Sequence, residues 1–160
     1  YGSRIKGNYY RLVQSLARSR FIPIGNGANR RTLVYDKDVA HAAVMALKHP
    51  AAAGKIFNVS DGEIHTLNNI IIAICAALDR KPPRFSLPIS PVRFAVGIVE
   101  DTMQRVGINP PIMRATIDKY IEDVAVDSKL IQRELGFAPK YDLLRGWKDA
   151  VHEMRRLGDL

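Results

Sequence analysis

Apolar residues recur at helical spacing through most of the chain, and polar cap residues or prolines separate the helical stretches. In the last stretch, Leu143, Trp147 and Val151 follow one another at intervals of four residues, which places them on one face of a helix. Thr66 is a good N-cap for the strongly apolar stretch that follows it. The pattern predicts seven helices, at residues 7–19, 36–48, 66–80, 91–106, 111–121, 128–135 and from 142 toward the C-terminus.

Short apolar stretches between these helices favour strands. Residues 56–59 are mostly apolar and are closed by the turn signal Asp61-Gly62, which is typical of a parallel strand covered on both faces. Residues 32–35 and 85–87 are also predicted as short strands, and 124–126 as an extended segment. There is no internal repeat, low-complexity segment or linker. The expected fold class is α/β, helix-rich with few short strands, in a single domain over residues 1–160.

The composition, with 47% hydrophobic and 25% charged residues, is that of an ordinary globular domain and excludes disordered and collagen-like classes. The longest apolar run, 70–78, is shorter than the roughly 18 to 20 residues that cross a bilayer. A single cysteine, Cys75, allows no disulfide within the chain, and the four histidines lack the spacing of metal ligands. We therefore expect a soluble, cytoplasmic protein with no membrane partner and no metal.

The formal net charge of +8 comes from 24 Lys and Arg against 16 Asp and Glu. Such an excess attracts phosphorylated small molecules and nucleic acids alike. The basic residues are scattered and form no long run, which is atypical of a nucleic-acid-binding tail. Nucleic acid is therefore not an expected partner, although a basic nucleic-acid-binding domain stays open as a rival hypothesis.

The order of four sequence stretches resembles the C-terminal half of the extended short-chain dehydrogenases/reductases. That family includes UDP-glucose/galactose 4-epimerase-like enzymes, nucleotide-sugar dehydratases and 4-reductases. Tyr1-Gly2-Ser3 stands where the family has Tyr-Gly-Pro, and the resemblance implies the C-terminal portion of a Rossmann-type enzyme with the Rossmann half absent. The stretches that carry the resemblance are Tyr1–Asn8, Gly25–Ala40, Ile56–Gly62, and Val126–Lys129 together with Glu134–Phe137 and Pro139.

Two catalytic features of that family are missing from these residues. The turn Gly25-Asn26-Gly27 leads into Arg30-Arg31 and a predicted strand, whereas a dinucleotide fingerprint leads into a helix whose N-terminus meets the pyrophosphate. No tyrosine is followed four residues later by a lysine, so the catalytic Tyr-x-x-x-Lys is absent. We expect no catalytic residue, no bound cofactor and no activity in this chain by itself. The full-length parent would bind NAD(P) and oxidise a sugar carbon through a tyrosinate base.

The resemblance also implies a site for a nucleotide sugar such as a UDP-sugar. Arg31 matches the family arginine that reaches the nucleotide diphosphate, and a planar guanidinium suits bidentate contact with phosphate oxygens. A shift of one residue would give this role to Arg30. The helix that begins near residue 7 presents an N-terminus that favours an anion, although a plain helix cap explains it equally well. The expected substrate-binding residues are Lys6, Gly7, Asn8, Arg30, Arg31 and Arg114, the last as a second phosphate-binding arginine.

Asp36 and Asp38 resemble a pair of catalytic carboxylates, but their place at a predicted helix start makes N-capping the better interpretation. In the intact family the helix after Asp38 and the strand at 56–59 would pack on the Rossmann half. We therefore expect exposed apolar edges and self-association as a homo-oligomer. The parent reaction stays open between epimerase, dehydratase and UDP-sugar 4-reductase, and a non-catalytic binding module is a further rival.

Overall fold

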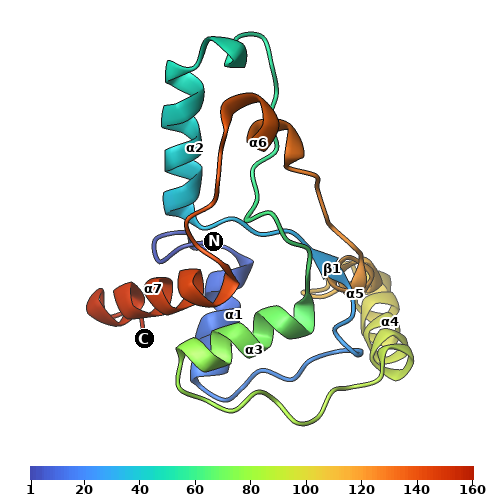
Figure 1. Ribbon diagram of the computed structural model, residues 1–160. Coiled ribbons are helices and arrows are strands. Elements are labelled where there is room, and N and C mark those ends of the chain that lie inside the picture. Colours follow the sequence, from blue (N-terminus) through green and yellow to red (C-terminus); the bar gives the residue numbers. More distant parts are fainter.

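The computed structural model describes residues 1–160, and helices make up most of its regular structure (Figure 1). The two-residue strands β1 and β2 pair antiparallel, with Arg30 opposite Thr66 and Arg31 opposite His65. All seven predicted helices are present, which confirms the helix-rich fold class. The elements are α1 Asn8–Ala17, β1 Arg30–Arg31, α2 Asp36–Lys48, the 3-10 helix Pro50–Ala52, β2 His65–Thr66, α3 Leu67–Ala77, α4 Ile89–Arg105, α5 Arg114–Ile121, α6 Lys129–Leu135 and α7 Leu143–Arg156.

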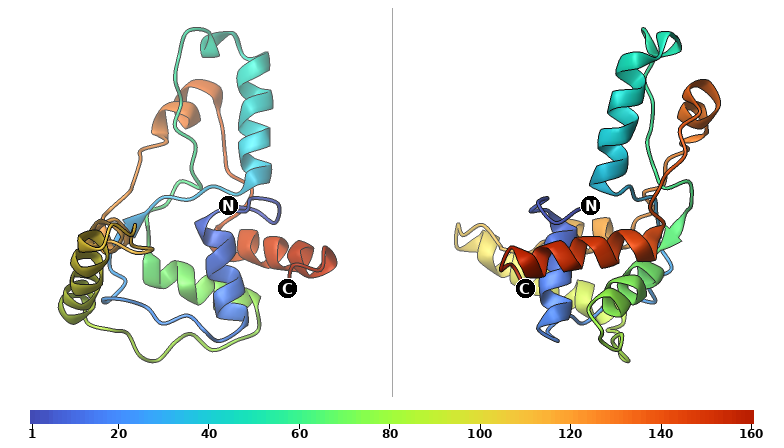
Figure 2. Two further views of the ribbon diagram at one scale, coloured as in Figure 1. Left: turned by 180° about the vertical axis from the view of Figure 1, so that it is seen from behind. Right: turned by 60° about the vertical axis from the view of Figure 1, so that its left-hand side comes forward.

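The main hydrophobic core lies between α1, α3 and α7. The apolar helix α3 buries Ile70 and Ile74, which lie one turn apart. Trp147 and Val151 on the apolar face of α7 are buried in the same cluster. Figure 2 shows α7 crossing α1, with α3 alongside. Because each large buried side chain contributes about 1.5–3 kcal/mol, this cluster fixes the three helices relative to one another.

The helices α2 and α6 form an arm that projects from the main core (Figure 1). We use the name "arm" for α2, residues 50–59 and α6. A small separate core holds it together, made from Ala42, Ile131, Leu135 and Phe137. Other apolar side chains of the arm face solvent, since Leu47 is 86% and Ile56 is 90% exposed. The arm therefore carries the uncovered apolar surface that the sequence led us to expect.

The predicted strands differ from the observed ones. Residues 32–35 and 56–59 are not strands, and the observed strand lies just before the first of them, at β1. Residues 56–59 make no backbone hydrogen bond within the chain. The segments 85–87 and 124–126 contribute one isolated parallel bridge each, to Ile24 and Arg31 respectively. A strand needs a neighbour for its backbone groups, and residues 56–59 contact neighbouring segments only through side chains, such as the bond from Asn58 Nδ2 to the Asp127 carbonyl at 3.3 Å.

Asp36 and Asp38 do not cap α2, so the N-capping interpretation is wrong. The start of α2 has no side-chain cap hydrogen bond. Asp38 is only 1% exposed, and its two oxygens accept the backbone N–H of Lys140 at 3.0 and 3.2 Å. Its Oδ2 also accepts the N–H of Tyr141 at 3.1 Å. Asp38 therefore ties α2 to the segment that enters α7, a contact across about a hundred residues of chain that local pattern does not reveal.

Thr66 caps α3 as predicted, because its Oγ1 accepts the N–H of Asn69 at 3.1 Å. Asp142 does the same for α7, accepting the N–H of Arg145 at 2.8 Å. Each such cap is worth about 1 kcal/mol. These two caps set where the helices of the main core begin.

The chain contains neither a membrane-spanning helix nor a cluster of metal-ligating side chains. None of its helices combines the length and the apolarity that a membrane crossing requires. Nowhere do three or more His, Cys, Asp or Glu side chains gather in a way that could hold a metal ion.

Candidate functional site

The candidate diphosphate site is built around β1. Before this strand, Gly25 and Gly27 have φ angles of 75° and 64°, in the left-handed region that favours glycine. Asn26 Oδ1 accepts the N–H of Ala28 at 3.0 Å and closes the turn. The chain then enters a strand. The glycine turn therefore does not present backbone N–H groups at a helix N-terminus, as a dinucleotide fingerprint does.

Two segments that are far apart in the sequence hydrogen-bond to β1, one on each side. On one side β1 pairs with β2. On the other, Val124 donates its N–H to the Arg30 carbonyl at 2.8 Å, and Thr32 donates its N–H to the Val124 carbonyl at 3.2 Å. Arg30 and Arg31 therefore sit on backbone that is held from both sides.

The guanidinium of Arg31 holds the C-terminal end of α5. Its Nη2 donates to the carbonyl oxygens of Tyr120 at 3.1 Å and Lys119 at 3.3 Å, and its Nη1 donates to the carbonyl of Glu122. Carbonyls at a helix C-terminus lack helical partners and carry partial negative charge, so a cation is favourable there. A guanidinium has five N–H donors. These three bonds leave two donors for another ligand.

Arg30 is the more available arginine of the pair. Its backbone N–H donates to Asp123 Oδ1 at 2.6 Å. Its side chain is exposed, and the guanidinium makes no hydrogen bond or ion pair within the chain. An anion can therefore approach Arg30 without displacing a protein partner.

The start of α1 is a second element of the chain that favours an anion. Burial raises the pKa of Tyr9, on the first turn of α1, and the nearby Arg31 cation acts in the opposite direction. Gly7 is the N-cap of α1, and no side chain caps the first-turn N–H groups that begin at Asn8. An anion at this terminus would therefore meet the positive end of a helix.

Lys6 is already engaged in the structure. Its Nζ lies 2.7 Å from Asp159 Oδ2 and 2.9 Å from the hydroxyl of Tyr10. The hydrogen bond with Asp159, and to a smaller extent the one with Tyr10, raises the pKa of Lys6. Lys6 therefore links the start of α1 to the C-terminal residues, and binding a phosphate would require it to exchange Asp159 for the ligand.

A cavity of about 80 Å³ lies beside the start of α1 and is lined mainly by apolar side chains. The rings of Tyr1 and Trp147 stack there with centroids 4.2 Å apart. The Tyr1 hydroxyl and Trp147 Nε1 are buried without a hydrogen-bond partner. Burial raises the pKa of Tyr1 far above its ordinary value. Tyr1 therefore stays neutral and packs as a core residue.

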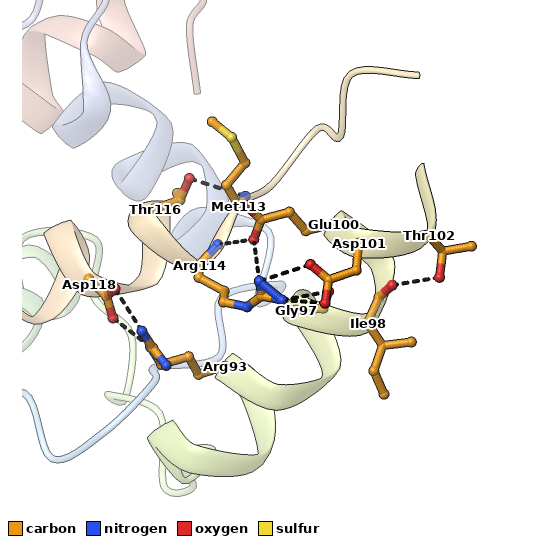
Figure 3. A network of polar contacts seen from close by, with 10 residues as sticks. All are labelled: Arg93, Gly97, Ile98, Glu100, Asp101, Thr102, Met113, Arg114, Thr116 and Asp118. Atoms are coloured by element: carbon orange, nitrogen blue, oxygen red, sulfur yellow. Dashed lines mark hydrogen bonds and ion pairs between the residues drawn. The ribbon is translucent and has the colours of Figure 1, made fainter. Parts of the chain in front are cut away.

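Arg114 is surrounded by carboxylates of α4 (Figure 3). Its Nη1 and Nη2 donate to Asp101 Oδ1 at 3.0 Å and Asp101 Oδ2 at 2.5 Å, and its backbone N–H donates to Glu100 Oε2 at 2.9 Å. Its Nη2 also donates to the Gly97 carbonyl at 3.2 Å. In this arrangement Arg114 joins α4 to α5, and a phosphate would have to compete with two acidic side chains.

The structure brings some of the expected residues together and separates others. Arg31 lies at the C-terminal end of α5, and Arg114 is its first residue. Since α5 has eight residues, its ends are about 11 Å apart. Arg30 and Arg31 lie together on β1. Arg114 instead borders a cavity of about 320 Å³ beside α4.

Two buried polar pairs near β1 were not anticipated from the sequence. Asp61 Oδ2 lies 2.7 Å from His65 Nε2, and His65 is the cross-strand neighbour of Arg31. The hydroxyls of Ser60 and Ser128 lie 2.7 Å apart, and both residues are buried. An aspartate four residues before a histidine, across a turn, is a signal that could have suggested the first pair. No local signal connects the two serines.

Comparison with known proteins finds one matching family model. Residues 2–60 match the NAD dependent epimerase/dehydratase family. An N-acetyl-alpha-D-glucosaminyl-diphospho-ditrans,octacis-undecaprenol 4-epimerase from Escherichia coli O157:H7 is 24% identical, over 91% of this chain and 44% of that protein. A UDP-glucose 4-epimerase from Vibrio cholerae is 26% identical, over 94% of this chain and 43% of that protein. The chain is therefore similar to the NAD-dependent epimerase/dehydratase family over residues 2–60, and to these two 4-epimerases over most of its length.

One solved structure has the same fold as this chain over nearly its whole length. The crystal structure of gox2253 superposes with a TM-score of 0.74 over 99% of this chain and 47% of that one. At 24% identity this likeness concerns the fold alone. The chain spans less than half the length of the curated relatives it matches.

Proposed function

We propose that this chain forms the nucleotide-sugar-binding part of an NAD(P)-dependent epimerase/dehydratase-family enzyme, with a UDP-sugar as its ligand. The observation that carries the proposal is the pair Arg30 and Arg31 on β1, with the uncapped N-terminus of α1 as a second anion-favouring element of the chain. A guanidinium fork and a helix N-terminus both favour the negative charge of a diphosphate. By their names, the two curated relatives act on UDP-glucose and on a sugar joined through a diphosphate to undecaprenol. A sugar diphosphate is common to both.

In this proposal the two arginines have different tasks. Arg30, whose guanidinium is free, makes the direct contact with a phosphate. Arg31 is already held by α5 carbonyls and offers its two remaining donors from a fixed position. A pre-organised group loses little conformational entropy when it binds. Lys6 and Arg114 are secondary, because each must first leave a carboxylate.

The bond-making groups of the parent enzyme lie outside these residues. The chain has no Tyr-x-x-x-Lys, and its Gly25-Asn26-Gly27 turn leads into a strand. We therefore propose that it binds no NAD(P) and is inactive by itself. In the parent, NAD(P) would supply hydride transfer while this part binds and orients the sugar. The same role serves an epimerase, a dehydratase or a UDP-sugar 4-reductase.

Calorimetric titration of the chain with UDP and UDP-glucose tests the proposal. Removing a charged hydrogen-bonding group costs about 1.5–3 kcal/mol, so Arg30→Ala should weaken UDP binding by about tenfold or more. Arg18→Ala is the matched control, since Arg18 is also an exposed arginine but lies at the other end of α1. Equal weakening in both variants would show that UDP senses net charge and not this site.

The same titration separates the rival hypotheses. A short oligonucleotide that bound with steep salt dependence, while UDP and UDP-glucose did not bind, would make the sugar-nucleotide proposal wrong. Binding of UDP without any activity from the full-length parent would favour the non-catalytic module. Consumption of NAD(P)H by the parent would favour the 4-reductase over the epimerase.

A further inference from the structure

The turn that follows α5 bonds to the backbone of Arg30 on both sides. Asp123 Oδ1 accepts the N–H of Arg30 at 2.6 Å, across 93 residues of chain. Val124, the next residue of the turn, donates its N–H to the carbonyl of Arg30 at 2.8 Å. Because both backbone groups of Arg30 are held in this way, the direction in which its side chain leaves the strand is fixed by residues 123 and 124.

Asn29, just before β1, holds the end of α5 from the other direction. Its Nδ2 donates to the Tyr120 carbonyl at 3.0 Å. Arg31 Nη2 donates to the same carbonyl at 3.1 Å. A carbonyl oxygen has two lone pairs, so the amide and the guanidinium can both bond to it. Asn29 therefore fixes the position of an acceptor that in turn orients the Arg31 guanidinium.

Few apolar contacts hold α4 and α5 against the rest of the chain. Gly97 is the one buried residue of α4, and Ile117 is the one buried residue of α5. The two helices pack on each other, and neither packs to a comparable extent on α1, α3 or α7. The Tyr120 ring is the part of α5 that reaches the main core. The polar contacts described above are therefore a large share of what keeps the end of α5 beside β1 (Figure 1).

We propose that Asp123 and Asn29 are positioning residues for the diphosphate that the arginine pair binds. The inference rests on the proposed function and adds two residues that need not touch the ligand. Asp123 acts through the backbone of Arg30, and Asn29 acts through the carbonyl that orients Arg31. A side chain that is held in place before binding loses less conformational entropy when the ligand arrives. The two residues therefore raise the affinity for phosphate without adding a contact to it.

The charge of Asp123 by itself predicts the opposite effect on binding. Asp123 is exposed, and a carboxylate beside Arg30 repels the phosphates of a ligand. If Asp123 were only a neighbouring charge, its removal would strengthen UDP binding. The positioning role predicts weaker binding when the hydrogen bond to Arg30 is lost. The sign of the change in affinity therefore distinguishes the two roles.

Calorimetric titration of Asp123→Ala and Asp123→Asn with UDP tests the role of Asp123. Both variants lose the charge, but the asparagine keeps an oxygen that can accept the Arg30 N–H. We expect Asp123→Ala to bind UDP about two- to tenfold more weakly than Asp123→Asn, which is the range for ordering one long side chain. Affinity for uridine, which has no phosphate, should not differ between them. Circular dichroism checks that each variant is folded.

Variants of the arginines test the route by which each residue acts. In an Arg30→Ala background, Asp123→Ala and Asp123→Asn should bind UDP equally, because the side chain that Asp123 positions is gone. Asn29→Ala should weaken UDP binding of the otherwise unmodified chain about two- to tenfold. The same change should have no further effect in an Arg31→Ala background.

The matched control is the pair Asp127→Ala and Asp127→Asn. Asp127 is also an exposed aspartate whose Oδ1 accepts a backbone N–H, but that N–H belongs to Lys129, at 2.7 Å, and not to an arginine of β1. The two control variants should bind UDP equally.

Equal UDP affinity of Asp123→Ala and Asp123→Asn, while Arg30→Ala still weakens binding, overturns this inference and leaves the proposed function standing. A difference between them that persists in the Arg30→Ala background, or that the Asp127 variants also show, overturns it as well. If the unmodified chain does not prefer UDP to uridine, the proposed function fails and this inference fails with it.

Discussion

Replacing Asp38 by alanine tests the most buried charged contact of the structure. Asp38 is 1% exposed and accepts hydrogen bonds from the backbone N–H groups of Lys140 and Tyr141. The alanine leaves both donors without a partner, and each such loss costs about 1–3 kcal/mol. We expect Asp38→Ala to lower the free energy of unfolding by about 3 kcal/mol. In a domain of this size each kcal/mol shifts Tm by about 2–4 °C, so Tm should fall by about 6–12 °C.

Urea denaturation followed by the fluorescence of the single tryptophan, Trp147, measures this change, because Trp147 is buried in the main core. Asp38→Asn keeps the shape and one acceptor oxygen and should cost about half as much. Asp127→Ala is the exposed control, since Asp127 accepts one N–H, from Lys129, at 2.7 Å. If Asp38→Ala changed stability by no more than Asp127→Ala does, the link between α2 and residues 140–141 would not hold the fold as described.

Three further predictions concern acid, thiol chemistry and assembly. The hydrogen bond from Lys37 holds the pKa of Asp149 below its ordinary value of 3.8. The Asp149 carboxylate therefore stabilises the fold above that pH, and this contribution is lost as the pH falls through its lower native pKa. In urea denaturation measured at a series of acidic pH values, Asp149→Asn should make the free energy of unfolding fall less steeply as the pH is lowered. Burial raises the pKa of the Cys75 thiol, so a thiol reagent should label it only as the chain unfolds. Rapid labelling of the native chain would contradict its burial. The uncovered arm should cause self-association that Leu47→Ser with Ile56→Ser reduces, whereas a monomer by light scattering at high concentration would count against it.

Helices were predictable from the sequence because their evidence is local. The spacing of Leu143, Trp147 and Val151 specifies the buried face of α7, and Thr66 caps α3 as its position suggests. Strands were less predictable because a strand depends on its neighbour. Residues 56–59 have the pattern of a covered strand, but no segment of the chain pairs with them.

The sequence proposes the residue types of the candidate site but does not reveal their contacts. The basic pair on β1 could be chosen from the sequence, but the bonds from Arg31 to carbonyls about 90 residues away could not. The predicted N-capping role of Asp38 was wrong for the same reason, because its hydrogen-bond partners lie about a hundred residues further along the chain. Long-range polar contacts of this kind leave no periodic trace in the sequence, whereas apolar helix faces do.

The central claim is that Arg30 and Arg31 bind the diphosphate of a nucleotide sugar. Its most direct test compares the affinity of the chain for UDP with its affinity for uridine, before and after Arg30→Ala. The account predicts that UDP binds at least about tenfold more tightly than uridine, and that the variant loses most of this difference. Equal binding of UDP and uridine by the unmodified chain, or a difference that survives in Arg30→Ala and Arg31→Ala alike, would contradict it.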